Sequence, residues 1–249
     1  SDDNKGKIPS KQSWAYQLVS NTNKFAHDNY VCTAKAGAGN SGIARRVFNA
    51  VANTKDISCV VIMWSFNSRY DWAMPRHKNL ENTRWATISP WDTDRANEER
   101  HEALLGSEGQ QEDWKYREEL LVNTGIKPFA ESIYRYAANE YHETYLSWKS
   151  IIWLQNLLEK KKIPFMFTLA DNSLFYNKLK PHSEQDPFMK ALFNEIDFTK
   201  WVSFGERMMG FNQWTLMEEY PRGTTHPLDK AHEDAVKLML PKFNKIIGK

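Results

Sequence analysis

Three short clusters of small and polar residues have the residue types and spacing that chemistry requires. The first contains Gly37, Gly39 and Gly42, and its spacing matches the dinucleotide-binding fingerprint. Glycines in that fingerprint allow a tight turn and let a pyrophosphate approach the N-terminus of a helix. The fingerprint also expects an acidic residue after the following strand, whereas the nearby Asp56 precedes it. A nucleotide site is therefore kept as an alternative.

The second cluster, residues 65–69, follows a long apolar run and contains Ser65, Asn67 and Arg69. Asn and Ser are common at such positions because their side chains form turns with the local backbone. In a functional interpretation, Asn67 donates a hydrogen bond to an oxyanion. Arg69 in that interpretation binds an anionic group of the substrate.

The third cluster is His226 and Pro227, just before the last helical pattern of the chain. A residue before proline favours extended backbone, so the imidazole can project from a loop. Taken alone, such a histidine is more often a surface or packed side chain. His232 follows six residues later, which is not the i, i+4 spacing of helical zinc ligands, so neither a metal nor a cofactor is expected.

Composition describes an ordinary globular chain of 249 residues, with 41% hydrophobic residues and a formal net charge of +2. This length favours one domain spanning residues 1–249. The charges are interspersed without a basic stripe, so nucleic acid is not an expected partner. Cys32 and Cys59 both fall in apolar runs and are expected to be buried thiols. No run approaches the roughly 18 apolar residues that span a bilayer, which indicates a soluble, cytoplasmic protein.

The apolar patterns predict strands that alternate with helices. Expected strands cover residues 30–34, 57–64 and 163–169. A first helix is expected after a cap at Ser10 or Ser13, and further helices are expected over residues 43–51, 129–162 and 228–247. The last helix is expected to bury Ala231, Ala235, Leu238 and Met239. Such alternation indicates a largely parallel sheet with helices on both faces, whose working residues gather where strands end.

A polar, Trp-rich insertion interrupts this pattern at about residues 67–125. Its tryptophans are expected either to pack a lid onto the domain or to stack on sugar rings of a substrate. Trp72 lies nearest to the second cluster in sequence. The tryptophans concerned are Trp72, Trp85, Trp91 and Trp114.

Together, the order of the clusters and elements resembles the SGNH or GDSL hydrolase superfamily, and in particular the divergent SGNH-like proteins often encoded by bacteriophages. The resemblance covers most of the chain through its order of elements, although the motifs are short. It implies an α/β fold, a flavodoxin-like three-layer α/β/α sandwich with a mainly parallel sheet. The Trp-rich segment is then an insertion into a single domain.

The resemblance also implies roles for the clusters in acyl transfer. Gly37 supplies a backbone N–H to the oxyanion hole, Asn67 supplies a second donor, and His226 is the general base. We assign a second set of residues to substrate binding. That set is Asn40, Ser65, Arg69 and Trp72.

Two parts of the family pattern are missing. The family's nucleophilic serine follows a first strand, and no apolar strand precedes Ser1, so we expect an upstream segment or a rearrangement that fills the same slot. Ser1 itself is an alternative nucleophile. The orienting Asp usually precedes the His by three residues, where this chain has Gly223, and Asp229 follows His226 instead.

Three hypotheses about function remain open. The first is an SGNH-like serine hydrolase of the esterase, lipase or carbohydrate acetylesterase type, with catalysis intact, impaired or lost. The expected partner is a small-molecule or carbohydrate ester, and the expected location is the cytoplasm, that of the host if the gene belongs to a phage. The second is a non-catalytic binding or structural protein that keeps the fold. The third is a nucleotide-binding Rossmann-like domain.

Overall fold

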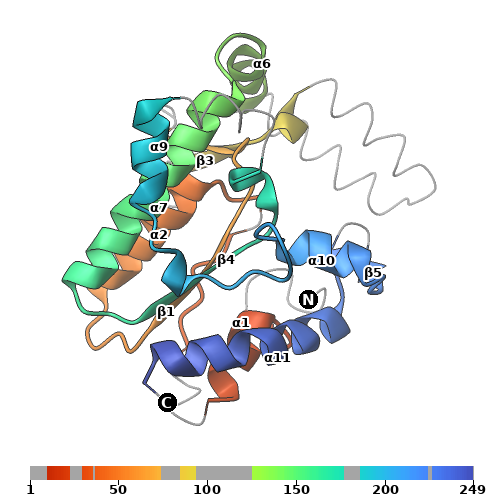
Figure 1. Ribbon diagram of the computed structural model, residues 1–249. Helices are drawn as coiled ribbons and strands as arrows, with labels where there is room; N and C mark the ends of the chain where they lie inside the picture. The colour runs from red at the N-terminus through yellow and green to blue at the C-terminus, as the bar shows by residue number, and fades with distance from the viewer. Residues whose placement is uncertain are drawn as a thin grey trace.

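The computed structural model describes residues 10–22, 30–35, 37–73, 85–93, 125–176, 186–223 and 226–248 (Figure 1). This part of the chain is a mixed α/β structure. Its helices are α1 (Trp14–Ser20), α2 (Asn40–Asn53), α6 (Ile126–Tyr136), α7 (Glu140–Lys160), α9 (Pro187–Asn194), α10 (Phe211–Met217) and α11 (Asp229–Ile246). Its strands are β1 (Val60–Trp64), β2 (Tyr70–Ala73), β3 (Trp85–Ile88), β4 (Phe165–Leu169), β5 (Arg222–Gly223) and β6 (His226–Pro227). Single 3₁₀ turns are η3 (Pro90–Asp92), η4 (Asn172–Leu174) and η5 (Phe198–Lys200).

The parallel pair β1 and β4 forms the centre of the fold. It runs from Val60 opposite Phe165 to Trp64 opposite Leu169, which confirms the parallel pairing expected from the two apolar runs. Every residue of β4 is buried, as expected for a strand covered on both faces. Trp201 extends the sheet through a parallel bridge to Phe167. Both strands end on the same side, which we call the carboxyl edge.

Helices cover both faces of this pair (Figure 1). Successive side chains of a strand point to opposite faces, so each strand contributes to two cores. Ile62 and Trp64 of β1 pack with α2 and α7, and Met166 of β4 packs with α1 and α11. Of the predicted inner stripe of α11, Ala231, Ala235 and Met239 are buried, whereas Leu238 is 50% exposed, so the prediction was wrong for that residue.

The single long helix predicted over residues 129–162 is two helices. The chain leaves the helical path after α6, and Asn139 starts α7 by accepting a hydrogen bond from the His142 N–H on its side chain at 2.9 Å. An N-cap of this kind satisfies a backbone donor that a new helix would otherwise leave unpaired. Tyr136 follows the helical spacing of the apolar residues in 129–162, which predicts an inner position, but it is 77% exposed at the end of α6.

The strand predicted at residues 30–34 is absent, because the segment is irregular and bonds to no strand of the described part. Val31 is 65% exposed, and Cys32 is exposed where a buried thiol was expected. Cys59 is half-buried, and both cysteines are free thiols. Without a neighbouring strand, the backbone groups of an apolar run gain nothing from a strand conformation.

One edge of β1 is also unpaired. The Val60 N–H donates to the Pro164 carbonyl and the Trp64 carbonyl accepts from the Ala170 N–H, so these residues face β4. By alternation, the backbone groups of Val61 and Met63 face away from β4. In the described part of the chain no strand pairs with them.

The Trp-rich insertion is described only in part. Its described portion contains the antiparallel pair β2 and β3, which joins Tyr70 to Ile88 at one end and Ala73 to Trp85 at the other. The Trp85 ring lies 4.2 Å from the guanidinium carbon of Arg45, so this tryptophan packs on α2. The prediction for Trp114 lies outside the described residues.

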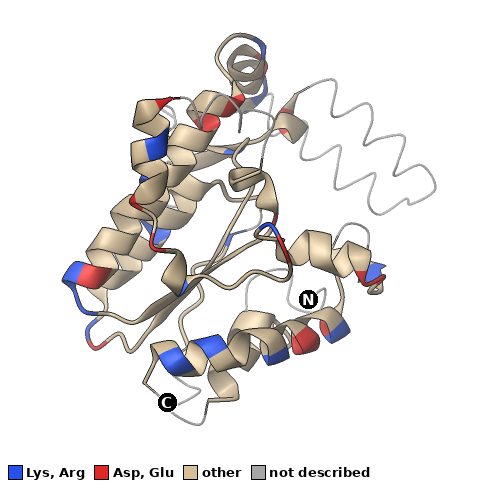
Figure 2. Ribbon diagram, viewed as in Figure 1, with Lys and Arg blue, Asp and Glu red and all other residues tan. Residues whose placement is uncertain are grey.

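Charged residues of both signs are scattered over the ribbon (Figure 2). Among the helices that the structure describes, none has the length and apolar character to cross a membrane.

Candidate functional site

Asn40, the first residue of α2, joins that helix to the carboxyl edge. The Ser65 N–H donates to Asn40 Oδ1 at 2.8 Å, and Asn40 Nδ2 donates to the Ser65 carbonyl at 3.1 Å and to Ser147 Oγ at 3.0 Å. Asn40 is 2% exposed, so these bonds are shielded from water. The amide thus pairs with the end of β1 as a neighbouring strand would. Sequence analysis assigned Asn40 to the site, and the structure gives it a positioning role.

The second cluster forms a turn directly after β1. Arg69 Nη1 donates to Ser65 Oγ at 2.8 Å, which closes the turn from its first residue to its last. The guanidinium carbon also lies 4.7 Å from the centre of the Phe66 ring. Asn67 is half-buried within this turn. The structure therefore brings Asn40, Ser65 and Arg69 together at one edge.

Each glycine of the first cluster has a structural reason within the chain. Gly37 has a φ of +72°, in the left-handed region that favours glycine. A Cβ on Gly39 would lie 2.3 Å from the Arg69 carbonyl oxygen, and one on Gly42 would lie 2.7 Å from Asp71 Oδ1. The packing of α2 on the segment after β1 explains Gly39 and Gly42, and the positive φ explains Gly37, so none of the three requires a nucleotide.

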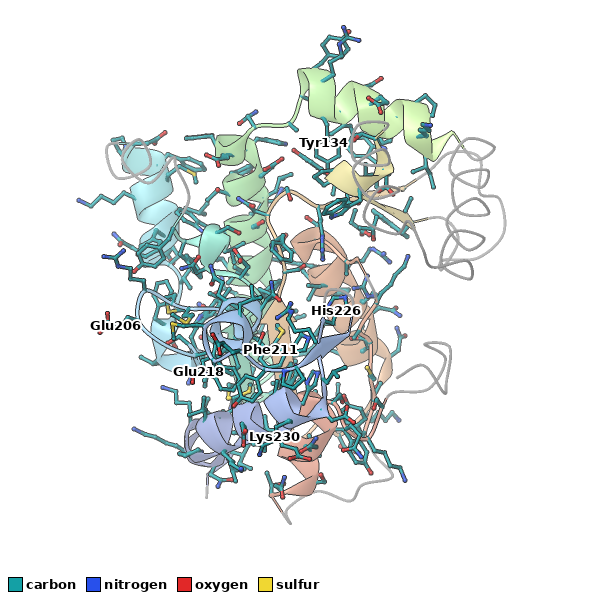
Figure 3. All side chains as sticks on the ribbon, turned by 90° about the vertical axis from the view of Figure 1, so that its right-hand side faces the viewer. Tyr134, Glu206, Phe211, Glu218, His226 and Lys230 are labelled. Atoms are coloured by element: carbon teal, nitrogen blue, oxygen red, sulfur yellow. The ribbon has the colours of Figure 1, made fainter. Side chains whose placement is uncertain are left out.

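His226 lies on the antiparallel ribbon of β5 and β6, where it pairs with Gly223. This ribbon packs on α10 and α11, and Figure 3 shows His226 near Phe211 of α10 and above Lys230 of α11. Burial and the positive charges of Arg222 and Arg69 lower the pKa of the imidazole. Since the residue as a whole is exposed, the two guanidinium groups are the more specific causes. His226 is thus neutral at pH 7 and close to the second cluster.

Arg222 is a site residue that sequence analysis missed. Its guanidinium donates to Thr215 Oγ1 at 2.9 Å and to Asn212 Oδ1 at 2.6 Å, both on α10. The Asn212 N–H in turn donates to the Ala170 carbonyl at 2.9 Å, which fixes α10 at the end of β4. The only signal in the sequence is a position four residues before His226.

Gly37 and Trp72 were both assigned to the site from the sequence, but no contact in the described part of the chain joins either of them to the turn after β1. Gly37 lies in an exposed turn two residues before the N-cap of α2. Trp72 is 49% exposed and packs edge-on against Phe129 of α6, with 5.3 Å between ring centres. Trp72 thus supports the lid interpretation of the insertion more than a substrate contact.

A buried polar network holds the second cluster from behind. The Tyr134 hydroxyl donates to the Ser68 and Ile88 carbonyls, and the Tyr70 hydroxyl donates to Glu143 Oε1 at 3.1 Å. Glu143 is 7% exposed, and its burial raises the pKa of its carboxyl group. The sequence gives no signal for these residues, because Tyr134 and Glu143 fall in the helical pattern of residues 129–162 and Tyr70 falls in the Trp-rich insertion.

The Glu143→Gln variant is expected to be more stable than the unmodified protein at pH 8 and equally stable near pH 4. A carboxyl group whose pKa is raised by folding favours the folded state while protonated, and this contribution is lost as pH rises through the folded-state pKa. Gln keeps an oxygen that accepts the Tyr70 hydrogen bond. Thermal unfolding of both proteins at pH 4, 6 and 8 measures the difference, and a loss of stability at pH 8 would contradict the expectation.

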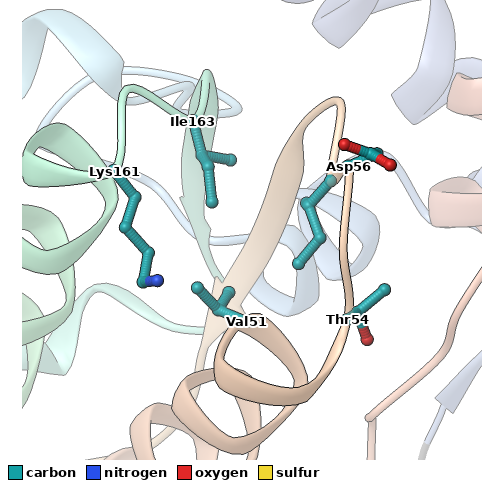
Figure 4. A pocket seen from close by; sticks show the side chains of 6 residues that line it. Val51, Thr54, Asp56, Lys161 and Ile163 are labelled. Atoms are coloured by element: carbon teal, nitrogen blue, oxygen red, sulfur yellow. The ribbon is translucent and has the colours of Figure 1, made fainter.

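A separate pocket lies at the opposite end of the sheet, where α2 leads into β1 and α7 leads into β4 (Figure 4). Asp56 and Lys161 provide its charged groups, and Val51, Thr54, Ile57 and Ile163 complete the lining. It contains none of the residues assigned from the sequence. In the residues that the structure describes, no group of three His, Cys, Asp or Glu side chains is arranged to hold a metal.

Comparisons of the chain with protein-family models, with curated proteins and with solved structures found no match.

Proposed function

We propose that the protein is an SGNH-like hydrolase of ester bonds, built as a three-layer α/β/α sandwich, with its active site at the carboxyl edge. The observation that carries this proposal is the packing of the His226 strand on α10, whose Asn212 N–H bonds to the Ala170 carbonyl at the end of β4, next to the turn after β1. It means that two clusters chosen from distant parts of the sequence lie close together. A neutral imidazole beside polar groups at strand ends is suited to accept a proton from an attacking hydroxyl.

In the proposed reaction, a hydroxyl oxygen attacks the ester carbonyl carbon while His226 accepts the hydroxyl proton. The carbonyl oxygen becomes an oxyanion, and the Asn67 amide is the proposed donor to it. The carbon–oxygen bond to the alcohol then breaks, and the imidazolium returns the proton to the departing oxygen. Water repeats the sequence on the acyl group and releases the carboxylic acid.

The nucleophile and the orienting acid are the open elements of this proposal. The suggested Ser1 lies outside the described residues, and the Ser65 hydroxyl accepts a hydrogen bond from Arg69. Burial lowers the pKa of His232 and the charge of Asp229 partly opposes that effect, whereas no carboxylate of the described residues acts on the pKa of His226. A base without an orienting acid gives slower catalysis rather than none. The same observation favours a second candidate, a binding protein that holds an ester without cleaving it.

Hydrolysis of 4-nitrophenyl acetate by the protein and its His226→Ala variant tests the proposal. Loss of a general base is expected to lower kcat/KM by about 100-fold or more. His142→Ala, an exposed histidine in the first turn of α7, is the matched control and is expected to leave the rate unchanged. Equal rates from the His226→Ala variant and the unmodified protein would refute the hydrolase proposal. Binding of the ester without turnover by the unmodified protein would favour the second candidate.

The pH profile gives an independent check. Because the pKa of His226 is lowered, the neutral imidazole persists to lower pH than that of an ordinary histidine. The rate of hydrolysis is therefore expected to fall only below the usual histidine range of about 6.5. The Arg69→Gln and Arg222→Gln variants each remove a positive charge, so the midpoint of the profile should move to higher pH in both. If the midpoint of the pH profile is the same in both variants and in the unmodified protein, His226 is not the group whose titration controls the rate.

A further inference from the structure

Among the residues that the structure describes, Arg69 is a half-buried guanidinium group with no ionic partner. Its hydrogen bond goes to the Ser65 hydroxyl at 2.8 Å, and its ring contact goes to Phe66. Burial lowers the pKa of this arginine, which reflects the cost of removing its charge from water. In the described part of the chain, no carboxylate forms an ion pair with it.

The acidic residue nearest to Arg69 in sequence, Asp71, forms an ion pair with a different arginine. Asp71 Oδ2 lies 2.9 Å from Arg45 Nε, and the Asp71 side chain is 3% exposed. Its charge also acts on Arg46. Asp71 thus compensates the arginines of α2, and among the described residues no carboxylate pairs with Arg69, two residues before it.

A second guanidinium adds positive charge to the same place. Arg222 is held on α10 by the neutral oxygens of Thr215 and Asn212, and α10 is fixed at the end of β4. Arg69 is held at the end of β1, and β1 and β4 are adjacent parallel strands. Both arginines act electrostatically on His226, which lies close to them.

From this arrangement we propose that Arg69, with Arg222 beside it, binds an oxyanion group of the ligand. A desolvated, unpaired guanidinium is costly to maintain, and a carboxylate or phosphate would offset that cost. Most of the Arg69 N–H donors are not used by Ser65, and a planar guanidinium can hold two oxygens of such a group at once. If the proposed hydrolase function holds, the substrate is an ester that also carries a carboxylate or phosphate. The anion site itself does not depend on that function.

Binding of inorganic phosphate to the full chain, measured by calorimetry at constant ionic strength with chloride, tests the site. We expect Arg69→Gln to weaken phosphate binding by about tenfold or more, because charge-assisted hydrogen bonds are lost. Arg135→Gln, on the surface of α6, is the control and should bind phosphate as the unmodified protein does. Unchanged phosphate binding in Arg69→Gln, or none in the unmodified protein, would overturn the proposal.

A measurement on the unmodified protein avoids any folding defect of the variant. Phosphate bound between the two arginines should raise the pKa of His226, which NMR titration of the imidazole reports, and no change in that pKa would overturn the proposal. Rates of hydrolysis of a neutral and of a carboxylate-bearing nitrophenyl ester then distinguish the proposed anion site from the proposed hydrolase function. Phosphate binding at Arg69 without hydrolysis of either ester supports the anion site and not the hydrolase. Hydrolysis without preference for the charged ester and without phosphate binding refutes the anion site alone.

Discussion

Replacing Asn40 with alanine is expected to lower the free energy of unfolding by about 3 kcal/mol, since two buried backbone groups would lose their partners. The Asn40 amide accepts from the Ser65 N–H and donates to the Ser65 carbonyl, and Ser65 is 7% exposed. Alanine offers neither group, and a buried site gives water little access to replace them. Urea denaturation should show a lower midpoint with an unchanged slope.

Asn53→Ala is the matched control, because it makes the same change at the other end of α2. Among the described residues the Asn53 side chain bonds to Asn49 alone, and it is exposed, so the midpoint should move little. Asn40→Asp separates the two bonds to Ser65, because a carboxylate keeps the acceptor and loses the donor. It should be destabilised as well, and more so at pH 7 than at pH 4. A midpoint for Asn40→Ala equal to that of Asn53→Ala would show that Asn40 does not support the end of β1.

The central strands could be predicted because their signal is local. The continuous apolar runs that contain β1 and β4 are bounded by polar turns, and burial on both faces is the environment such runs require. The run at residues 30–34 has a similar composition but no neighbour in the described part, and it is not a strand. Strand formation depends on a partner that local composition does not reveal.

The helices show the same limit. One apolar stripe runs through residues 129–162, so periodicity alone predicted a single helix. The break is decided by Asn139, whose side chain caps α7. Asparagine is favoured at such caps, but one cap residue inside a continuous apolar stripe is a weaker signal than the stripe itself.

The candidate site was predictable in its location more than in its chemistry. Parallel strands end at one edge, so the cluster after β1 was expected to face other clusters. Burial and the positive charges of Arg222 and Arg69 lower the pKa of His226, which agrees with a position of His226 near that cluster. The roles of two residues could not be predicted. Asn40 bonds to the backbone of Ser65, and Arg222 is held at the site by hydrogen bonds to α10. Such roles depend on tertiary contacts between residues far apart in sequence.

Replacing Gly39 with alanine is the second large effect that we expect, a loss of about 3 kcal/mol from overpacking against rigid backbone. The added Cβ would lie 2.3 Å from the carbonyl oxygen and 2.8 Å from the carbonyl carbon of Arg69. Neither atom belongs to a flexible side chain, so α2 or the turn after β1 must move. Because the turn holds the Arg69 guanidinium, phosphate binding should weaken together with stability.

Gly37→Ala is the informative control, since it changes another glycine of the same cluster for a different physical reason. Gly37 has a positive φ, but a Cβ there would meet no atom within 4 Å. Only backbone strain remains, and the expected loss is about 1 kcal/mol. A dinucleotide site would instead make both glycines matter for ligand binding, because both would approach the pyrophosphate. Denaturation midpoints that are equal for the two variants would contradict the close packing of Gly39 on Arg69, which distinguishes them here.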